Sequence, residues 1–211
     1  FKHLAVSPLN SRERLVALID NEIHFANKGK TCGLTLKCNN LVDREIVDKL
    51  YEASQAGVPV RLIVRGMCSL VPGLPGLSEN IEAISIVDGF LEHPRVYIGR
   101  NGGNPQYYIS SADLMTRNID YRVEVTCPIY DKKLQKMIQT IIDIQWADND
   151  KARIIDATQS NMFRERKPGT ARIRSQHVIH DYLSTGKKPR LPQLDYRPRS
   201  TVDDKASKKK K

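Results

Sequence analysis

The sequence predicts an α/β fold with a mixed β-sheet flanked by helices, and three observations lead to this class. Strand-like and helix-like segments alternate through residues 3–66, in the order strand, helix, strand, helix, strand. The stretch "VPVRLIVRG" is almost continuously apolar, as strands buried on both faces of a parallel sheet are. Two later strand-like runs flank "NGGN", a pattern typical of an antiparallel hairpin. We therefore expect parallel strands, joined by right-handed crossovers, beside an antiparallel part.

The first two elements follow from hydrophobic spacing. "HLAVS" (residues 3–7) is a short apolar strand. Residues 10–30 form a helix, because apolar side chains recur there at helical spacing: Leu15, Leu18, Ile19, Ile23 and Ala26. Asn10 and Glu13 have the spacing of a capping box at the start of this helix, and Gly29 stands where a helix ends.

The next three elements continue the alternation. Residues 31–39, "TCGLTLKCN", are a strand, and residues 41–57 are a second helix that is capped by Asp43 and closed by Gly57. Residues 58–66 are the apolar strand described above. Because ligands of such sheets gather at the carboxyl ends of the strands, the residues that follow each strand deserve a search for binding groups.

The second half of the chain supplies the remaining elements. The Gly- and Pro-rich residues 66–80 are a loop long enough to suggest a functional reason. Strands are expected at residues 81–87 and 121–129, in addition to the hairpin around "NGGN". Helical spacing predicts two further helices, at residues 130–148 and 175–185.

Length and charge divide the chain into a domain and a tail. A length of 211 residues suits one domain, which we place at residues 1–185. Residues 186–211 are rich in Lys and Pro, so we expect a basic, disordered tail. This tail holds ten Lys and Arg against three Asp, a net charge of +7, and leaves +3 of the total +10 to the domain. Such a modest charge argues against a large nucleic-acid footprint but is compatible with a focused anion pocket.

The sequence also suggests the cellular compartment and that this chain is part of a longer protein. No apolar run approaches the roughly 18 residues of a membrane span, so no transmembrane segment is expected. Because the chain begins with Phe1, we expect it to be a piece of a longer protein. The four cysteines form no CxxC pair, which favours reduced thiols and a cytoplasmic protein, with peripheral membrane association as an option. These cysteines are Cys32, Cys38, Cys68 and Cys127.

Polar residues that suit phosphate binding fall at predicted strand ends and loop edges. Arg65 ends one strand, and His93 with Arg95 begins another. A third group surrounds the end of the hairpin: Ser110, Ser111, Asp113, Arg117, Asn118, Arg122 and Glu124. Arginine suits phosphate because its planar fork donates two parallel hydrogen bonds. We expect no metal ligands in this set.

Each of these groups also has a purely structural explanation. His93 could be an ordinary histidine at a surface turn. Arg65 could make a strand-end ion pair with Glu92 or Asp88. The third group could be a structural salt-bridge network of Arg117, Arg122 and Glu124. The functional interpretation is favoured because the three groups converge on one polar end of the sheet.

Longer stretches carry a family resemblance. The segments "NNLVDREIVDKLYEASQAGVPVRLIVRGMCSL", "PGLSENIEAISIVDGFLEHPRVY" and "YISSADLMTRNIDYRVEV" closely resemble the C-terminal catalytic domain of bacterial polyphosphate kinase of the first type. The resemblance runs through most of residues 3–185. It implies a phospholipase-D-like sandwich, in agreement with the alternation of strands and helices.

The resemblance also implies an activity. Such enzymes transfer the terminal phosphate of ATP reversibly to inorganic polyphosphate, through a phosphohistidine and with magnesium. It implies that the phosphorylated histidine belongs to a preceding domain, that most Mg²⁺ ligands lie outside this chain, and that the full-length enzyme is a homo-oligomer. His93, in "FLEHPRV", matches the family's second histidine, and Arg65, in "VRGMC", matches an arginine that contacts the nucleotide phosphates.

Physical roles follow for these residues. Arg65 would supply fixed positive charge to a phosphoryl group in transfer, and His93 would act as a proton donor to a phosphate oxygen. Further candidates for binding the oxygens are Arg117 and Arg122, with Asp113, Glu124 and Ser111 in support.

The sequence departs from the expected patterns at three positions. Arg95 stands where the phospholipase-D pattern has lysine, and Gly89 and Leu114 stand where polyphosphate kinases usually have arginine and tryptophan. Gly89 thus removes a cation close to His93. Two other functions stay open: a noncatalytic module that binds polyphosphate or nucleic acid through the basic tail, and a phosphodiesterase that pairs two chains. The isolated chain is expected to be inactive as a kinase.

Overall fold

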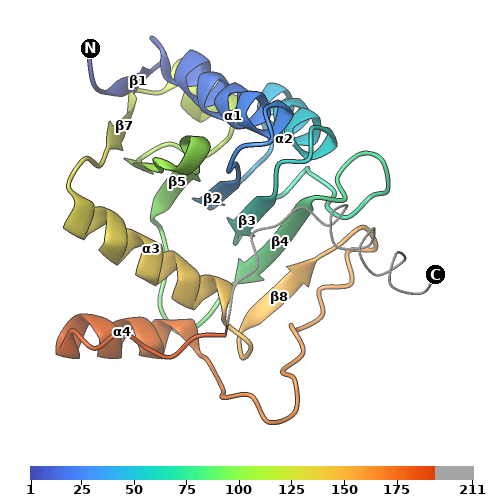
Figure 1. Cartoon of the computed structure of the whole chain (residues 1–211), viewed down its shortest axis with the longest axis vertical. Coiled ribbons are helices and arrows are strands. Elements are labelled where there is room, and N and C mark those ends of the chain that lie inside the picture. The colour runs from blue at the N-terminus through green and yellow to red at the C-terminus, as the bar shows by residue number, and fades with distance from the viewer. Residues whose placement is uncertain (193–211) are drawn as a thin grey trace.

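The computed structural model describes residues 1–192, which form one eight-stranded sheet with helices on both faces (Figure 1). The strands are β1 Ala5–Ser7, β2 Leu34–Cys38, β3 Val60–Val64, β4 Ile81–Ile86, β5 Arg95–Gly99, β6 Gln106–Ser110, β7 Glu124–Pro128 and β8 Ala152–Ile155. The helices are α1 Ser11–Asn27, α2 Arg44–Gln55, α3 Lys132–Trp146 and α4 Ser175–Thr185. Two short turns of helix lie at Asn101–Gly103 and Arg117–Tyr121.

The sheet is mixed, as the sequence predicts. Its strand order is β1-β7-β6-β5-β2-β3-β4-β8. β2, β3 and β4 are parallel, and every other neighbouring pair is antiparallel. The carboxyl ends of β2, β3 and β4 therefore lie at the same end of the strands as the start of β5, the end of β6 and the start of β7. This border of the sheet, across the strand ends, is called the polar edge below, and it collects residues that are far apart in the chain.

One face of the sheet is covered by α1 and α2 (Figure 1). The core beneath them joins helix residues such as Leu18 and Leu50 to the alternate strand residues Leu36, Leu62 and Tyr97. Since side chains alternate along a strand, the residues between these face the other way. β3 thus contributes buried apolar residues to both faces, which explains the near-continuous apolar run that predicted it.

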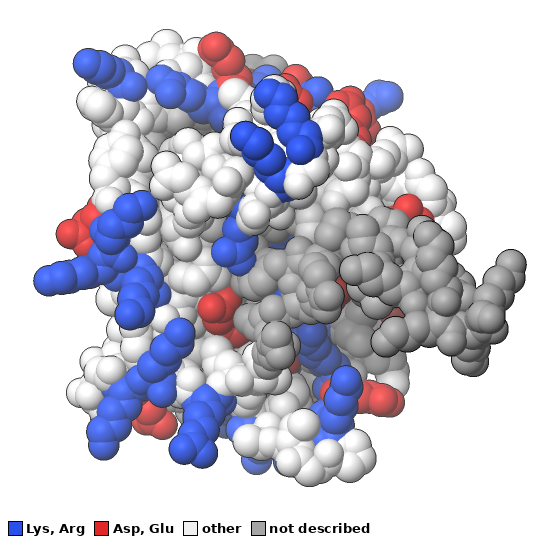
Figure 2. All heavy atoms as spheres, in the orientation of Figure 1, with Lys and Arg blue, Asp and Glu red and all other residues white. Residues whose placement is uncertain are grey.

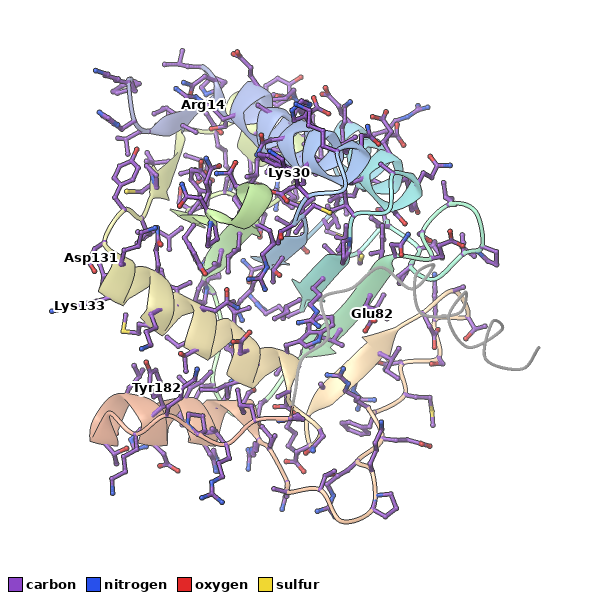
Figure 3. The ribbon with its side chains drawn as sticks, viewed as in Figure 1. Arg14, Lys30, Glu82, Asp131, Lys133 and Tyr182 are labelled. Atoms are coloured by element: carbon purple, nitrogen blue, oxygen red, sulfur yellow. The ribbon has the colours of Figure 1, made fainter. Side chains whose placement is uncertain are left out.

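The opposite face is covered by α3, with α4 packed beside it. Ile142 and Trp146 of α3 pack against Ile63, Ile84 and Ile98 of the sheet. The helix α3 is capped by Asp131, whose carboxylate accepts the backbone N–H groups of the first turn at 2.8 and 2.9 Å. Figure 3 shows Asp131 and Lys133 together at this end of the helix.

Most predicted elements are confirmed, but one cap is wrong. Asp43 caps α2 by accepting the backbone N–H of Ile46 at 3.2 Å. Asn10 precedes α1 but makes no side-chain cap, because its Oδ1 accepts the backbone N–H of Val6 at 2.7 Å. The predicted capping box with Glu13 is therefore a mistake: the asparagine holds β1 instead.

One strand was not predicted. β8 runs antiparallel to β4 and forms an edge of the sheet. Its outer side contacts a loop rather than another strand, with the guanidinium of Arg153 over the ring of Phe163 at 3.8 Å. With four residues and two charged neighbours at its start, β8 gives little periodicity to detect.

Two predictions concern the C-terminal tail and the absence of a transmembrane segment. Of the predicted tail, residues 186–192 are described without regular structure, and residues 193–211 lie outside the described residues, so the predicted disorder there and the domain boundary at residue 185 stay predictions. Within residues 1–192, no helix combines the length and the apolar character needed to cross a bilayer.

Candidate active site

The strand register places the predicted residues on the polar edge. Arg65 directly follows β3, and His93 lies two residues before the first residue of β5, Arg95. Arg95 pairs with Ser110 at the end of β6, and its neighbour Val96 pairs with Lys37 near the end of β2. Segments from four strands thus meet at the edge where ligands of such sheets bind.

Asp113 is the hydrogen-bonding centre of this edge. Its carboxylate accepts two bonds from Arg95, at 3.2 and 3.1 Å, in a bidentate ion pair. It also accepts the backbone N–H and side-chain amide of Asn39 at 2.8 and 3.1 Å, and those of Asn40 at 3.3 and 3.2 Å. Burial acts to raise the pKa of Asp113, but these donors outweigh it and lower that pKa. Asp113 is therefore an anion that locks the segments together.

Arg95 joins this centre to His93. Its Nη1 lies 2.9 Å from the Nδ1 atom of His93 and donates to the His93 carbonyl at 3.1 Å. Arginine can only donate, so Nδ1 is the acceptor and the ring hydrogen sits on Nε2. The His93 side chain is exposed, and it presents an N–H donor.

Arg65 joins the same centre from the other side. Its Nε donates to Oδ1 of Asn39 at 2.6 Å, and Asn39 in turn donates to Asp113. Arg65 and His93 are therefore the two ends of one hydrogen-bonded chain through Asn39, Asp113 and Arg95. The alternative partners proposed for Arg65 are wrong, because Asp88 and Glu92 pair elsewhere, as the following paragraphs describe.

The loop that carries His93 is anchored by a buried ion pair. Oε2 of Glu92 lies 2.5 Å from Nζ of Lys37, and the two side chains are 14% and 7% exposed. Gln145 of α3 and Gln176 of α4 also donate to the Glu92 carboxylate. Burial lowers the pKa of Lys37, and Glu92 opposes that effect. The residue next to His93 is thus held by three elements.

The same loop has a second anchor at the start of α4. Asp88 forms a bidentate ion pair with Arg174, with distances of 2.8 and 2.6 Å. The backbone of Phe90 exchanges two hydrogen bonds with the side chain of Gln176, at 3.0 and 2.8 Å. The nearest side-chain atom to a Cβ built on Gly89 is Nη2 of Arg174, at 3.8 Å. The guanidinium of Arg174, the residue that precedes α4, therefore lies beside the position where the sequence lacks a cation.

The third predicted group does not form the expected network. Glu124 accepts hydrogen bonds from Ser111 and, at 2.8 Å, from Asn118. Arg117 and Arg122 are exposed, and neither makes an ion pair with another residue in the range 1–192. The expected support of these arginines by Asp113 and Glu124 is thus wrong: Asp113 holds Arg95, and Glu124 fixes the turn.

Charge on the visible face is dispersed rather than concentrated. Figure 2 shows Lys and Arg side chains spread over this face with carboxylates between them, outside the grey atoms. No group of three or more His, Cys, Asp and Glu side chains among the described residues could hold a metal ion. The carboxylates of the polar edge are occupied by cations and N–H or O–H donors from the protein.

Several residues of the site were not found from the sequence. Asn39 and Asn40 follow β2 directly, so the strand-end argument that found Arg65 could also have found them. Lys37 interrupts an apolar strand, which is itself a sign of a special partner. Gln176 gave no such sign, because its contact with the His93 loop spans 86 residues of sequence.

The fold first places the protein in a structural class. The chain superposes on Nuc of Salmonella typhimurium, described as a phospholipase D family member, with a TM-score of 0.54, 14% identity and coverage of 73% of this chain and 97% of that one. At that identity the likeness shows the fold alone, and the class is a phospholipase-D-like α/β fold.

The family is more specific. Residues 4–176 match the model of the polyphosphate kinase C-terminal domain 2, and the chain belongs to this family. It is 56% identical to a polyphosphate kinase of Vibrio vulnificus over 188 residues and 53% identical to one of Escherichia coli over 189 residues, covering 89% and 90% of this chain. It superposes on the crystal structure of polyphosphate kinase from Porphyromonas gingivalis with a TM-score of 0.85 and 40% identity, over 88% of this chain and 28% of that one. The chain spans 27% of the length of these two curated relatives.

Proposed function

We propose that this chain is the ATP-side half of a polyphosphate kinase active site, in which the terminal phosphate of ATP passes reversibly to polyphosphate. The nucleophilic histidine would belong to a preceding domain. The observation that carries this proposal is the hydrogen-bonded chain that links Arg65 to His93 on one edge of the sheet. Family membership supplies the substrates, ATP and polyphosphate.

Arg65 and His93, the two ends of this hydrogen-bonded network, suit different tasks. A phosphoryl group in transfer carries charge on its equatorial oxygens, so fixed cations and N–H donors stabilise it. Arg65 uses its Nε for Asn39, which leaves the outer nitrogens of the guanidinium for an anion. His93 offers Nε2–H as a donor. To act as an acid, as the sequence suggests, the ring would need a proton on both nitrogens, and the bond from Arg95 to Nδ1 would have to break first.

Arg117 and Arg122 fit the binding of further phosphate oxygens. Both side chains are exposed and unpaired within the described part of the chain, so no carboxylate competes with a phosphate for them. Ser111 and Glu124 fix the turn that carries them. We therefore keep these arginines as secondary contacts to the polyphosphate chain.

Magnesium does not fit the described residues. Mg²⁺ prefers carboxylate oxygens and water, and the carboxylates of the polar edge are already bonded to Arg95, Lys37, Ser111 and Asn118. A Mg²⁺ ion that accompanies ATP would take its protein ligands from outside residues 1–192. The homo-oligomer and the cytoplasmic location, with or without peripheral membrane association, rest on the resemblance and composition alone.

A pair of histidine variants tests the proposal in the full-length kinase. His93→Ala should lower kcat for polyphosphate synthesis by about 100-fold or more, because the N–H donor at the transferring phosphate is removed. His24→Ala changes an exposed histidine on α1 and should stay within about twofold of the wild type. Equal effects of the two variants would sink the assignment of His93.

A second assay separates the proposal from its alternatives. The 211-residue chain alone should take up no label from γ-labelled ATP, because the nucleophile lies elsewhere. Robust labelling would overturn this division of roles. Loss of all polyphosphate binding on removal of residues 187–211, with no effect of Arg65→Gln, would instead favour the noncatalytic binding module. Nuclease activity that depends on dimer formation would favour the paired phosphodiesterase.

A further inference from the structure

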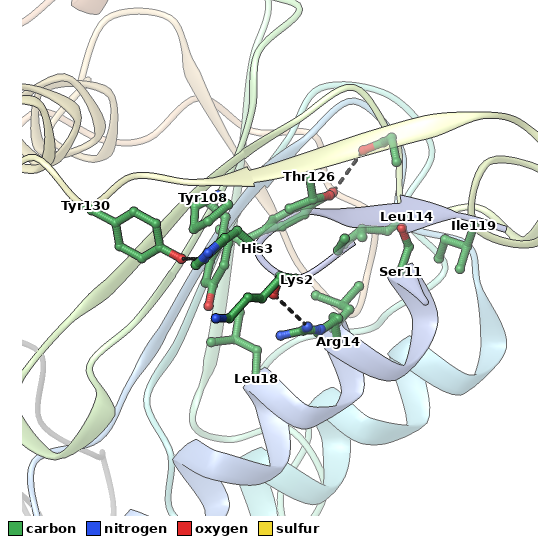
Figure 4. Close-up of a pocket in the computed structure, with 15 residues that line it drawn as sticks. Lys2, His3, Ser11, Arg14, Leu18, Tyr108, Leu114, Ile119, Thr126 and Tyr130 are labelled. Atoms are coloured by element: carbon green, nitrogen blue, oxygen red, sulfur yellow. Dashed lines mark hydrogen bonds between the residues drawn. The ribbon is translucent and has the colours of Figure 1, made fainter. Parts of the chain in front are cut away.

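A cavity lies between α1 and the β1-β7-β6 end of the sheet, away from the contacts of Arg65 and His93. It encloses about 110 Å³ (Figure 4). Its lining comes from the chain start, from α1 and from the strands around β6 and β7. None of the residues that form the Arg65 to His93 chain lines it. Its chemistry therefore needs its own explanation.

The floor of the cavity is apolar and contains aromatic surface. Leu15 and Leu18 of α1 face Tyr97 of β5, with Leu114 and Ile119 closing the far side. The hydroxyl of Tyr97 is occupied, because it donates to the carbonyl of Ala112 at 2.9 Å, so its ring is what it offers to the cavity. Such walls favour a flat hydrocarbon group over a bare anion.

Ser11 lines one end of the cavity but adds no polar group to it. The residue is only 9% exposed, and its Oγ is covered by protein and makes no hydrogen bond with any described residue. In Figure 4, Ser11 lies at one end of the cavity, and His3 and Tyr130 lie at the other.

The rim of the cavity is cationic. Lys2 and Arg14 line it, and no Asp or Glu does. The guanidinium of Arg14 has only a long contact, 3.4 Å, to the carbonyl of Lys2, so most of its donors are available. Burial raises the pKa of Tyr108 in the same lining, and the charge of Arg14 acts against this rise, which places that charge near the cavity.

Size limits the ligand further. A cavity of roughly 150 Å³ lined by apolar side chains holds one benzene molecule, so a cavity of about 110 Å³ takes at most one six-membered ring, and any charged substituent must lie at the rim. A fused nucleobase with its ribose would not fit. We propose that this cavity binds a monocyclic aromatic acid, with its ring against Leu18 and Tyr97 and its anionic group at Lys2 and Arg14.

Such a ligand would touch the segment that positions the candidate active site. Ala112 and Leu114 line the cavity and flank Asp113, whose carboxylate holds Arg95 and Asn39. The site does not depend on the proposed kinase function, since it is defined by the lining alone. Its occupancy should nevertheless be visible at Asp113.

Nuclear magnetic resonance of the 211-residue chain tests this inference, with 4-hydroxybenzoate as the probe. Saturable shifts are expected at the backbone amides of Leu18, Ala112 and Asp113. Arg14→Gln should weaken binding by about tenfold or more, the loss of one charge-assisted hydrogen bond. Arg44→Gln is the matched control: it removes the same charge from an exposed side chain on α2 that does not line the cavity, and affinity should not change.

Each part of the ligand has its own control. Inorganic phosphate and phenol, which supply the anion or the ring alone, should bind much more weakly than the probe. The inference is overturned if the probe gives no saturable shifts, if Arg14→Gln and Arg44→Gln behave alike, or if phosphate alone produces the same shifts.

Discussion

The ion pair between Asp113 and Arg95 should be a principal source of stability, and Asp113→Asn tests this. Both side chains are 9% exposed, and the carboxylate accepts bonds from Arg95, Asn39 and Asn40. Neutralising one partner leaves the other charge buried and unpaired, which costs about 3 to 5 kcal/mol. Since small domains are stable by only about 5 to 15 kcal/mol, the variant should unfold at a much lower urea concentration. The fluorescence of Trp146, the only tryptophan, reports the transition.

A second aspartate provides the control. Asp150 also forms a bidentate pair with an arginine, at 2.7 and 3.0 Å, but the side chain of that partner, Arg172, is 64% exposed. Surface pairs contribute about 0 to 1 kcal/mol, so Asp150→Asn should shift the unfolding midpoint little. Equal losses of the free energy of unfolding in the two variants would show that burial does not set the strength of these ion pairs.

The difference in the free energy of unfolding between the wild type and Asp113→Asn should also depend on pH. The pKa of Asp113 is lowered in the folded state. Its carboxylate therefore stabilises the fold fully above the ordinary aspartate value of about 4, and this contribution is lost as the pH falls through the lower folded value. Urea unfolding from pH 7 to pH 3 should show the gap between the two proteins closing below about pH 4. A gap that stays constant over this range would contradict the lowered pKa.

Two further substitutions test the surroundings of the site. Glu92→Gln should lower the free energy of unfolding by about 3 kcal/mol, because it leaves Lys37 charged and buried; a loss under about 1 kcal/mol in urea unfolding would show that water or another group compensates. Gly66→Ala should destabilise the fold by about 1 to 3 kcal/mol, because a Cβ there would lie 2.6 Å from Oδ1 of Asn40. Gly89→Ala meets nothing closer than 3.8 Å and should be neutral in the same urea unfolding assay.

The order of strands and helices could be predicted because local patterns decide it. β3 is apolar on both faces, and the hairpin of β5 and β6 surrounds an Asn-Gly pair, with Asn101 at φ 46° and Gly102 at φ 63°. Two local patterns misled. Asn10 has the spacing of a cap but bonds β1, and β8 exists because β4 offers it an edge, a fact that no local pattern carries.

The candidate site was predictable only at its strand ends. Arg65 could be found because it follows the carboxyl end of an apolar strand, where ligands of such sheets bind, and His93 because it stands beside a predicted strand and the family resemblance covers it. The ion pairs around them could not be predicted, because the fold decides which cation lies next to each carboxylate. Glu92 and Asp88 are near His93 in sequence, yet they pair with Lys37 and with Arg174, 55 and 86 residues away.

The central claim is that Arg65 and His93 bind one common anion. A titration of the chain, labelled with ¹⁵N in its Arg and His side chains, with inorganic tripolyphosphate measures this directly. The resonances of Arg65 Nε and His93 Nε2 should shift together with a single dissociation constant, and Arg65→Gln should weaken the response at His93 by about tenfold. Shifts at Arg65 without any at His93, or with a different dissociation constant, would contradict the claim.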